Sequence, residues 1–108
     1  MWYHSLVNDV KASLPDSAPR ARWTFLTNHA HVLIALTREP SARVRDIAEL
    51  VGITERAVLQ ILSDLEGAGV LEREREGRRN IYRVNAEVQL RHPLEAGHRV
   101  QELLSLAR

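Results

Sequence analysis

The sequence lacks cysteine and long hydrophobic runs, and each absence excludes a class of protein or a kind of site. Because none of the 108 residues is cysteine, a disulfide scaffold, a thiolate nucleophile, a cysteine metal site and a thiol redox sensor are all excluded. The longest uninterrupted apolar stretch runs only from Val32 to Leu36, whereas a helix that crosses a bilayer needs about 20 such residues. The first residues also lack the basic start and apolar centre of a signal peptide. We therefore expect a soluble cytoplasmic protein without a membrane partner.

The composition is that of one globular domain. A length of 108 residues with 44% hydrophobic and 27% charged residues excludes wholesale disorder. The net charge of +1 is unevenly distributed, since residues 72–91 carry six arginines against four glutamates while residues 23–71 carry four positive and six negative charges. Every basic residue except Lys11 is arginine. Arginine suits phosphate groups, although a GC-rich genome would also raise its use.

Apolar periodicity predicts the order helix, helix, helix, hairpin, helix. Residues 1–14 are expected to form an amphipathic helix, and two prolines mark residues 15–22 as a linker to a single domain over residues 23–108. The elements expected in that domain are helices over 23–38, 44–51 and 55–68, a hairpin over 70–84 and a helix from Pro93 to Ala107. This order predicts a winged helix-turn-helix, which is a mainly α fold with a β-hairpin wing.

Within the expected helix 23–38, the apolar face should include Trp23 and Phe25. His29 falls on the same face and is interpreted as a hydrogen-bonded core histidine.

The stretch from Val44 to Ile61 has the features of a helix-turn-helix in register. Ala48 provides the small residue that two steeply crossing helices need, and Gly52 tolerates the positive φ of the tight turn. Thr54 is placed to cap the second helix. These features together predict a recognition helix over residues 54–68.

The outward face of that helix and the tip of the hairpin are the expected DNA-binding surface. Arginine can read guanine and glutamine can read adenine in the major groove. Arginines at the tip of a wing can lie on the DNA backbone or enter the minor groove. The alternative is that this helix face is merely solvated and that the arginines at the hairpin tip serve only solubility. The expected DNA-binding residues are Thr54, Glu55, Arg56, Leu59, Gln60, Ser63, Arg78, Arg79 and Asn80.

Four segments carry a resemblance to a known family: Trp23 to His31, Gly52 to Val58, Gly77 to Asn80, and Arg91 to Glu95. With them, residues 23–106 resemble the small winged-helix transcriptional regulators of the MarR and ArsR type in prokaryotes. The resemblance implies a homodimer on a palindromic operator, with the helix 54–68 in the major groove and the wing 70–84 on the backbone and minor groove. It implies no known effector, so a small-molecule effector of unknown class stays open.

An apolar stripe on the last helix is expected to form the dimer interface, and the helix 1–14 is expected to enlarge it. In the alternative reading, part of the stripe packs on the protein's own first helix. The expected interface residues are Trp2, Leu6, Val10, Ala96, Val100, Leu103, Leu104 and Ala107.

Neither a metal site nor an active site is expected. Glu95, His98 and Glu102 share one face of the expected last helix and could hold a divalent ion, but they are read more simply as a solvated surface. No nucleophile–base pairing, phosphate loop or dinucleotide motif occurs, so we expect no cofactor and no enzyme. The rival function is a winged helix that serves as a protein–protein interaction module.

Overall fold

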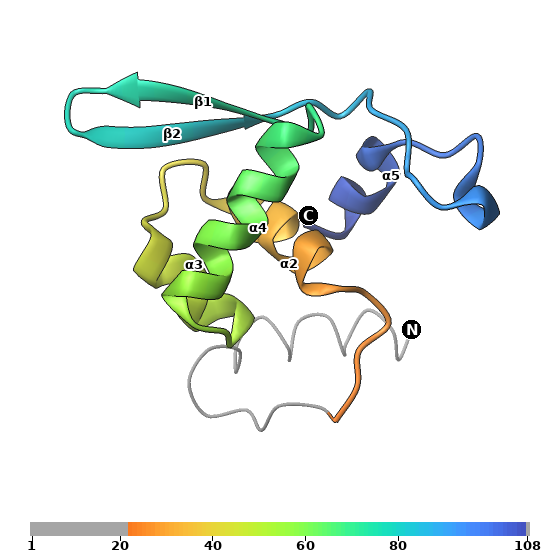
Figure 1. The fold of residues 1–108 in the computed structure, drawn as a ribbon, viewed down its shortest axis with the longest axis horizontal. Coiled ribbons are helices and arrows are strands. Elements are labelled where there is room, and N and C mark those ends of the chain that lie inside the picture. The colour runs from red at the N-terminus through yellow and green to blue at the C-terminus, as the bar shows by residue number, and fades with distance from the viewer. Residues whose placement is uncertain (1–21, 108) are drawn as a thin grey trace.

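The computed structural model describes residues 22–107 and shows a winged helix-turn-helix (Figure 1). The expected helix 1–14 and all of the linker 15–22 except Arg22 lie outside the described residues. In chain order, the elements are α2 (Asn28–Arg38), α3 (Val44–Val51), α4 (Glu55–Gly67), β1 (Leu71–Glu76), β2 (Arg79–Val84), a short 3₁₀ helix η1 (Pro93–Glu95), α5 (Val100–Leu104) and a second 3₁₀ helix η2 (Ser105–Ala107). No helix in the described part of the chain is long and apolar enough to span a membrane.

The helix-turn-helix forms as the sequence predicts. Gly52 ends α3 in the left-handed region with a φ of 87°, and its N–H donates to the carbonyl of Ala48 at 2.8 Å. Thr54 then caps α4, because its hydroxyl accepts from the Ala57 N–H at 3.0 Å. Ala48 of α3 is buried in the hydrophobic core. Each of these features depends on a few neighbouring residues, which is why the sequence predicts them.

The hairpin β1–β2 is held to the helical body along one edge. The two strands are antiparallel, with Leu71 opposite Val84 at the base and Glu76 opposite Arg79 at the tip. On the other edge of β2, the Tyr82 N–H donates to the carbonyl of Pro40 at 3.4 Å.

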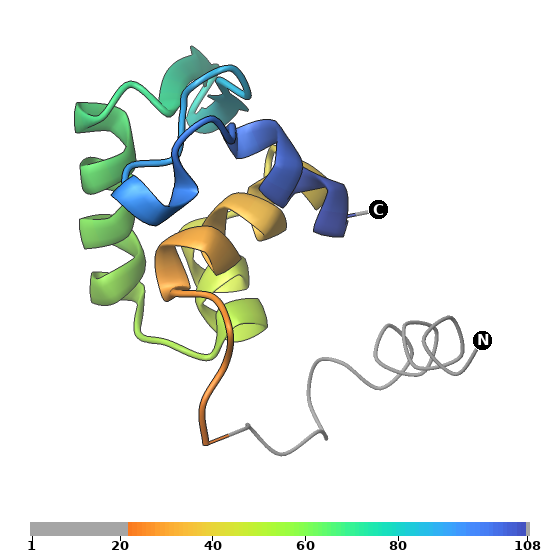
Figure 2. The same ribbon diagram turned by 90° about the vertical axis from the view of Figure 1, so that its right-hand side faces the viewer.

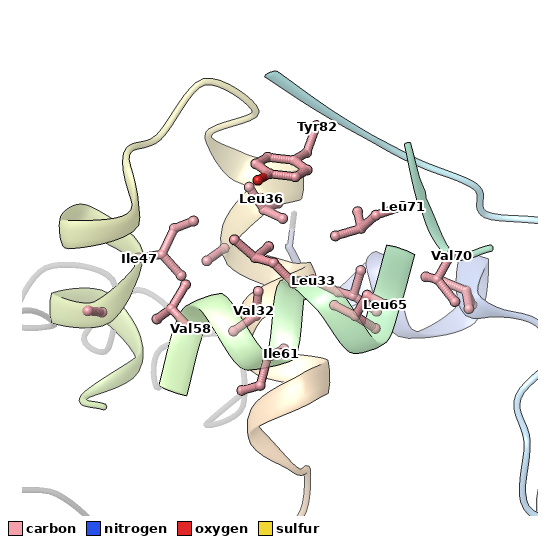
Figure 3. Packing of buried hydrophobic residues seen from close by; sticks show 14 residues of the cluster. Val32, Leu33, Leu36, Ile47, Val58, Ile61, Leu65, Val70, Leu71 and Tyr82 are labelled. Atoms are coloured by element: carbon pink, nitrogen blue, oxygen red, sulfur yellow. The ribbon is translucent and has the colours of Figure 1, made fainter. Parts of the chain in front are cut away.

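One hydrophobic core joins the helices and the wing. Figure 3 shows side chains of α2, α3, α4 and the hairpin converging on it. Leu36, Ile47, Val32 and Val58 are its largest fully buried side chains. The core fixes α4 with one face inward and leaves the opposite face free.

The first helix of the domain begins five residues later than predicted. Thr27 has extended backbone angles, and its hydroxyl accepts from the Ala30 N–H, so that the helix begins at Asn28. The expectation that Trp23 and Phe25 lie on the apolar face is therefore wrong: they are 68% and 91% exposed, with their rings edge to face. His29, expected in the core, lies in the exposed first turn of α2.

The expected continuous helix from Pro93 to Ala107 is also wrong. The chain turns at Gly97, where φ is 87°, and α5 begins only at Val100. Residues 88–90 compete for the backbone hydrogen bonds that a helix would use, since Leu90 N–H donates to the His98 carbonyl at 2.9 Å and Val100 N–H donates to the Val88 carbonyl at 2.8 Å.

The expected dimer stripe is consequently divided between different surroundings. Ala96 is exposed beside the turn, whereas Val100 is 3% exposed within the chain's own core. Leu103, Leu104 and Ala107 are half-buried. Of the other expected interface residues, Trp2, Leu6 and Val10 lie outside the described residues.

Candidate nucleic-acid interface

The outer face of α4 is exposed along the edge of the molecule. Figure 2 shows α4 at the left edge, with its outer side turned away from the other helices. Its inner side is buried through Val58, Ile61, Leu62 and Leu65. The structure brings together on the exposed side the six expected residues Thr54, Glu55, Arg56, Leu59, Gln60 and Ser63.

The residues at the start of α4 differ in what they can offer a ligand. The Thr54 hydroxyl already accepts from the Ala57 N–H. Glu55 places a carboxylate in the first turn, where its negative charge stabilises the helix by interacting with the positive end of the helix dipole. Arg56 follows on the exposed face and forms no ion pair with any of residues 22–107. Its guanidinium is therefore available.

Gln60 is held by a contact that the sequence did not predict. Its Nε2 donates to Asp64 Oδ1 at 3.1 Å, one turn further along α4. The other carboxylate oxygen of Asp64 lies 2.9 Å from Nε2 of His29 on α2. The hydrogen bond from His29, followed by that from Gln60, lowers the pKa of Asp64. The Asp64 carboxylate is thus ionised at neutral pH and engaged on both oxygens.

The three expected wing residues occupy different positions. Arg78 lies in the turn between the strands, exposed and without an ion pair among the described residues. Arg79 begins β2, and its guanidinium donates to the carbonyl of Ser41, so it fastens the wing to the loop after α2. Asn80 is half-buried and accepts from Arg75 Nη1 at 3.3 Å. Of the three, Arg78 is the residue at the tip.

The two faces of the wing differ in charge. Cross-strand partners point to the same side of a hairpin, so Arg73 and Arg75 share a face with buried Leu71 and Tyr82. All three glutamates of β1 point to the opposite face, where Arg83 Nη2 lies 2.5 Å from Glu74 Oε2.

Glu74 and Glu72 offset the positive charge of Arg83 across the hairpin. The hydrogen bond that Arg83 donates to Glu74, followed by the charges of Glu74 and Glu72, raises the pKa of Arg83.

The arginine face of the wing looks toward α4 across a groove. This groove has a volume of about 580 Å³ and is lined by Leu59, Leu62, Ser63, Glu66, Gly67, Arg73 and Tyr82. Arg73 also approaches Glu66 to 3.7 Å. Arg73 and Arg75 were not among the residues expected to bind DNA. The period-two alternation of arginine and glutamate from residue 72 to residue 76 was the signal that could have identified them.

The histidines near the C-terminal end are engaged locally. His98 Nδ1 lies 2.7 Å from Glu102 Oε1, and this hydrogen bond is the main cause that lowers the pKa of Glu102. Glu95 instead accepts from the backbone N–H of His92 at 3.1 Å. Within residues 22–107, no group of three or more side chains is arranged to hold a metal ion.

Residues 25–86 match the family model described as sugar-specific transcriptional regulator TrmB. The matched range contains α2, α3, α4 and the wing. A search of curated proteins found no match to the chain.

The chain is also similar to solved structures, among them two transcriptional regulators and a MarR family protein. MepR, a transcription regulator of the Staphylococcus aureus multidrug efflux pump MepA, is 16% identical, with 99% of this chain and 66% of MepR covered and a TM-score of 0.50. A Mycobacterium tuberculosis MarR family protein in complex with salicylic acid is 20% identical, with 77% of this chain and 58% of that protein covered and a TM-score of 0.51. The Streptomyces coelicolor regulator PcaV, in complex with its natural ligand, is 24% identical, with 78% of this chain and 55% of PcaV covered and a TM-score of 0.49. The chain thus spans 55 to 66% of the length of these proteins.

Proposed function

This chain belongs to the family described as sugar-specific transcriptional regulator TrmB, and we propose that it is a sequence-specific regulator that binds double-stranded DNA through α4 and the wing. The family and the fold are those of transcriptional regulators and not of enzymes. The expected resemblance to MarR-type winged-helix regulators is confirmed by the same matches.

The observation that carries the proposal is that the free face of the second helix of the helix-turn-helix adjoins the arginine face of the wing. A helix fits the major groove, and arginines beside it can neutralise the flanking phosphates. Arg56 and Gln60 face outward from α4, and Arg73 lines the groove between α4 and the wing. The two kinds of contact that a DNA-binding protein needs are therefore adjacent.

Each side chain takes a role from its chemistry in this proposal. Arg56 reads guanine, and Gln60 reads adenine. Leu59, which is 55% exposed, can contact a thymine methyl group, and Ser63 donates to or accepts from a base or a phosphate. Arg73, Arg75 and Arg78 contact phosphates, with Arg78 nearest the minor groove. Thr54, Glu55, Arg79 and Asn80 hold the helix end and the wing in place.

We further propose that the chain acts as a homodimer on a palindromic operator, as the family resemblance implies. Half-sites would then lie about one helical turn apart. The C-terminal segment from Leu103 to Ala107 supplies the contact. The sugar in the family's description is not carried over to this chain, because the match ends at residue 86, just past the wing. An effector of unspecified class is compatible with the proposal.

The salt dependence of binding to a random-sequence duplex tests this function. Each phosphate contact that releases a counterion adds about 0.9 to the slope of log affinity against log salt. Replacing both Arg75 and Arg78 by Ala should make that slope shallower by about two units and weaken binding to every sequence. These arginines have no ion pair within residues 22–107, so their loss should leave the fold intact.

The matched control replaces Arg22 and Arg91 by Ala, which removes the same charge from parts of the chain outside α4 and the wing. This variant should keep the wild-type slope. A wild-type slope near zero would contradict DNA binding and favour the protein–protein module. Equal slopes for the two double variants would contradict the assigned role of the wing.

A further inference from the structure

We propose that His29 and Asp64 are positioning residues that fix the side-chain amide of Gln60 in one orientation and thereby set which base Gln60 selects. This inference rests on the proposed function. Two hydrogen bonds link the side chains of His29, Asp64 and Gln60 in a row, and we call these three residues the Gln60 tether. The tether joins α2 to the DNA-facing side of α4.

The chemistry of the carboxylate decides the orientation of the amide. An ionised carboxylate can only accept hydrogen bonds, and its two hydrogen bonds lower the pKa of Asp64, which keeps it ionised. The group of Gln60 that faces Asp64 Oδ1 at 3.1 Å must therefore be the NH₂ group. The Oε1 atom and the second N–H of Gln60 remain for a ligand.

His29 holds the carboxylate from the neighbouring helix. Its Nε2 lies 2.9 Å from Asp64 Oδ2, so Nε2 carries the hydrogen and donates it. Asp64 could otherwise rotate about its side-chain bonds and release Gln60. With one oxygen held from α2 and the other from α4, the carboxylate is fixed by the packing of the two helices.

The remaining groups of Gln60 match one purine better than the other. Adenine presents the N7 acceptor and the N6 donor in the major groove, whereas guanine presents two acceptors, N7 and O6. The free oxygen of Gln60 can accept from adenine N6 while its second N–H donates to N7. Guanine would need two donors, and one N–H of Gln60 is already given to Asp64. The Gln60 tether therefore favours adenine over guanine.

The experiment selects duplexes from a random pool with the full chain and reads the base preference at each position. Gln60→Ala identifies the position that Gln60 reads and should abolish a preference of roughly 5- to 150-fold there. Asp64→Asn can present either its oxygen or its NH₂ to Gln60, so both amide orientations become possible. Asp64→Asn and His29→Ala should each lower the adenine-to-guanine preference at that position at least about threefold, with other positions unchanged.

Two further variants separate positioning from a merely structural role. His29→Gln keeps an N–H donor for Asp64 and should restore most of the adenine preference. His31→Ala removes a histidine from the same helix that contacts Asn28 and not Asp64, and it should behave as wild type. His29 and Asp64 are each 47% exposed, so these substitutions open no cavity in the core.

The outcomes distinguish this inference from the proposed function. If the wild-type chain selects a sequence, Gln60→Ala loses one position and both Asp64→Asn and His29→Ala keep the full preference there, the inference is overturned while DNA binding stands. A Gln60→Ala variant that keeps every preference also overturns the inference, because Gln60 would then read no base. A wild-type chain that neither selects a sequence nor shows salt-dependent binding overturns both.

Discussion

Tyr82 links the wing to the helices through one nearly buried side chain. It lies on β2 opposite Arg73, is 8% exposed and lines the groove beside α4. Burial, followed by the negative charge of Glu66, raises the pKa of its phenol. The folded chain therefore holds the phenolic proton more tightly than the unfolded chain does.

This raised pKa predicts a loss of stability in alkali. The contribution of Tyr82 is fully present below the unfolded tyrosine pKa of about 10 and is lost as the pH rises through the higher folded value. Tyr82→Phe has no phenol to ionise, so its melting temperature should fall less than that of the wild type between pH 9 and pH 11. Thermal unfolding of the two proteins at the two pH values measures this. Equal falls would show that Tyr82 is not the group responsible.

The residues that could be predicted from the sequence act through their nearest neighbours along the chain. Gly52 and Thr54 form a turn and a cap within four residues, so their types identify their roles. The contact between His29 and Asp64 joins positions 35 residues apart, and it depends on how α2 crosses α4. No pattern in a single sequence reveals such a pairing, and His29 was wrongly expected in the core.

Among the elements, the segment after the wing departs most from its sequence pattern. Ala96, Val100, Leu103 and Ala107 recur at helical spacing, yet the chain turns at Gly97 and pairs its backbone with residues 88–90. Tertiary hydrogen bonds override the periodicity there. At the start of α2, Trp23 and Phe25 also fit a helical period but precede the cap at Thr27. By contrast, α3 forms over the range predicted, from Val44 to Val51, and the hairpin forms within the predicted residues 70–84.

A pair of glycine substitutions tests the turn at Gly97. Its φ of 87° strains any other residue, and a Cβ there would meet no atom within 4 Å, so Gly97→Ala should cost about 1–2 kcal/mol of unfolding free energy from backbone strain alone. Gly67 ends α4 without a positive φ and with the same open space. Gly67→Ala should therefore stabilise the chain by up to about 1 kcal/mol. Urea unfolding of both variants measures the two changes in unfolding free energy. If Gly97→Ala stabilises the chain, the turn at Gly97 is contradicted and a continuous helix from Pro93 to Ala107 is favoured.

At the scale of the whole molecule, the proposed dimer can be tested by a substitution at one exposed leucine, Leu106. Leu106 in η2 is 48% exposed, whereas Val100 is buried in the chain's own core. Leu106→Asp should yield a folded monomer, because a carboxylate in an apolar interface is costly to desolvate. Leu94→Asp, at a leucine that is 89% exposed in η1, is the matched control and should remain a dimer. Light scattering distinguishes monomer from dimer, and circular dichroism checks that each variant is folded. If Leu106→Asp remains a dimer, the interface lies elsewhere.

Amide NMR shifts on adding a selected duplex locate the surface that DNA contacts, which we propose is formed by α4 and the wing. The largest shifts should fall at Arg56, Gln60 and Ser63 of α4 and along the hairpin from β1 to β2. Small shifts are expected around Trp23 and Phe25, which are exposed before α2 and outside the proposed interface. Shifts centred on those two aromatic residues, with α4 and the wing unchanged, would show that DNA does not bind at α4 and the wing.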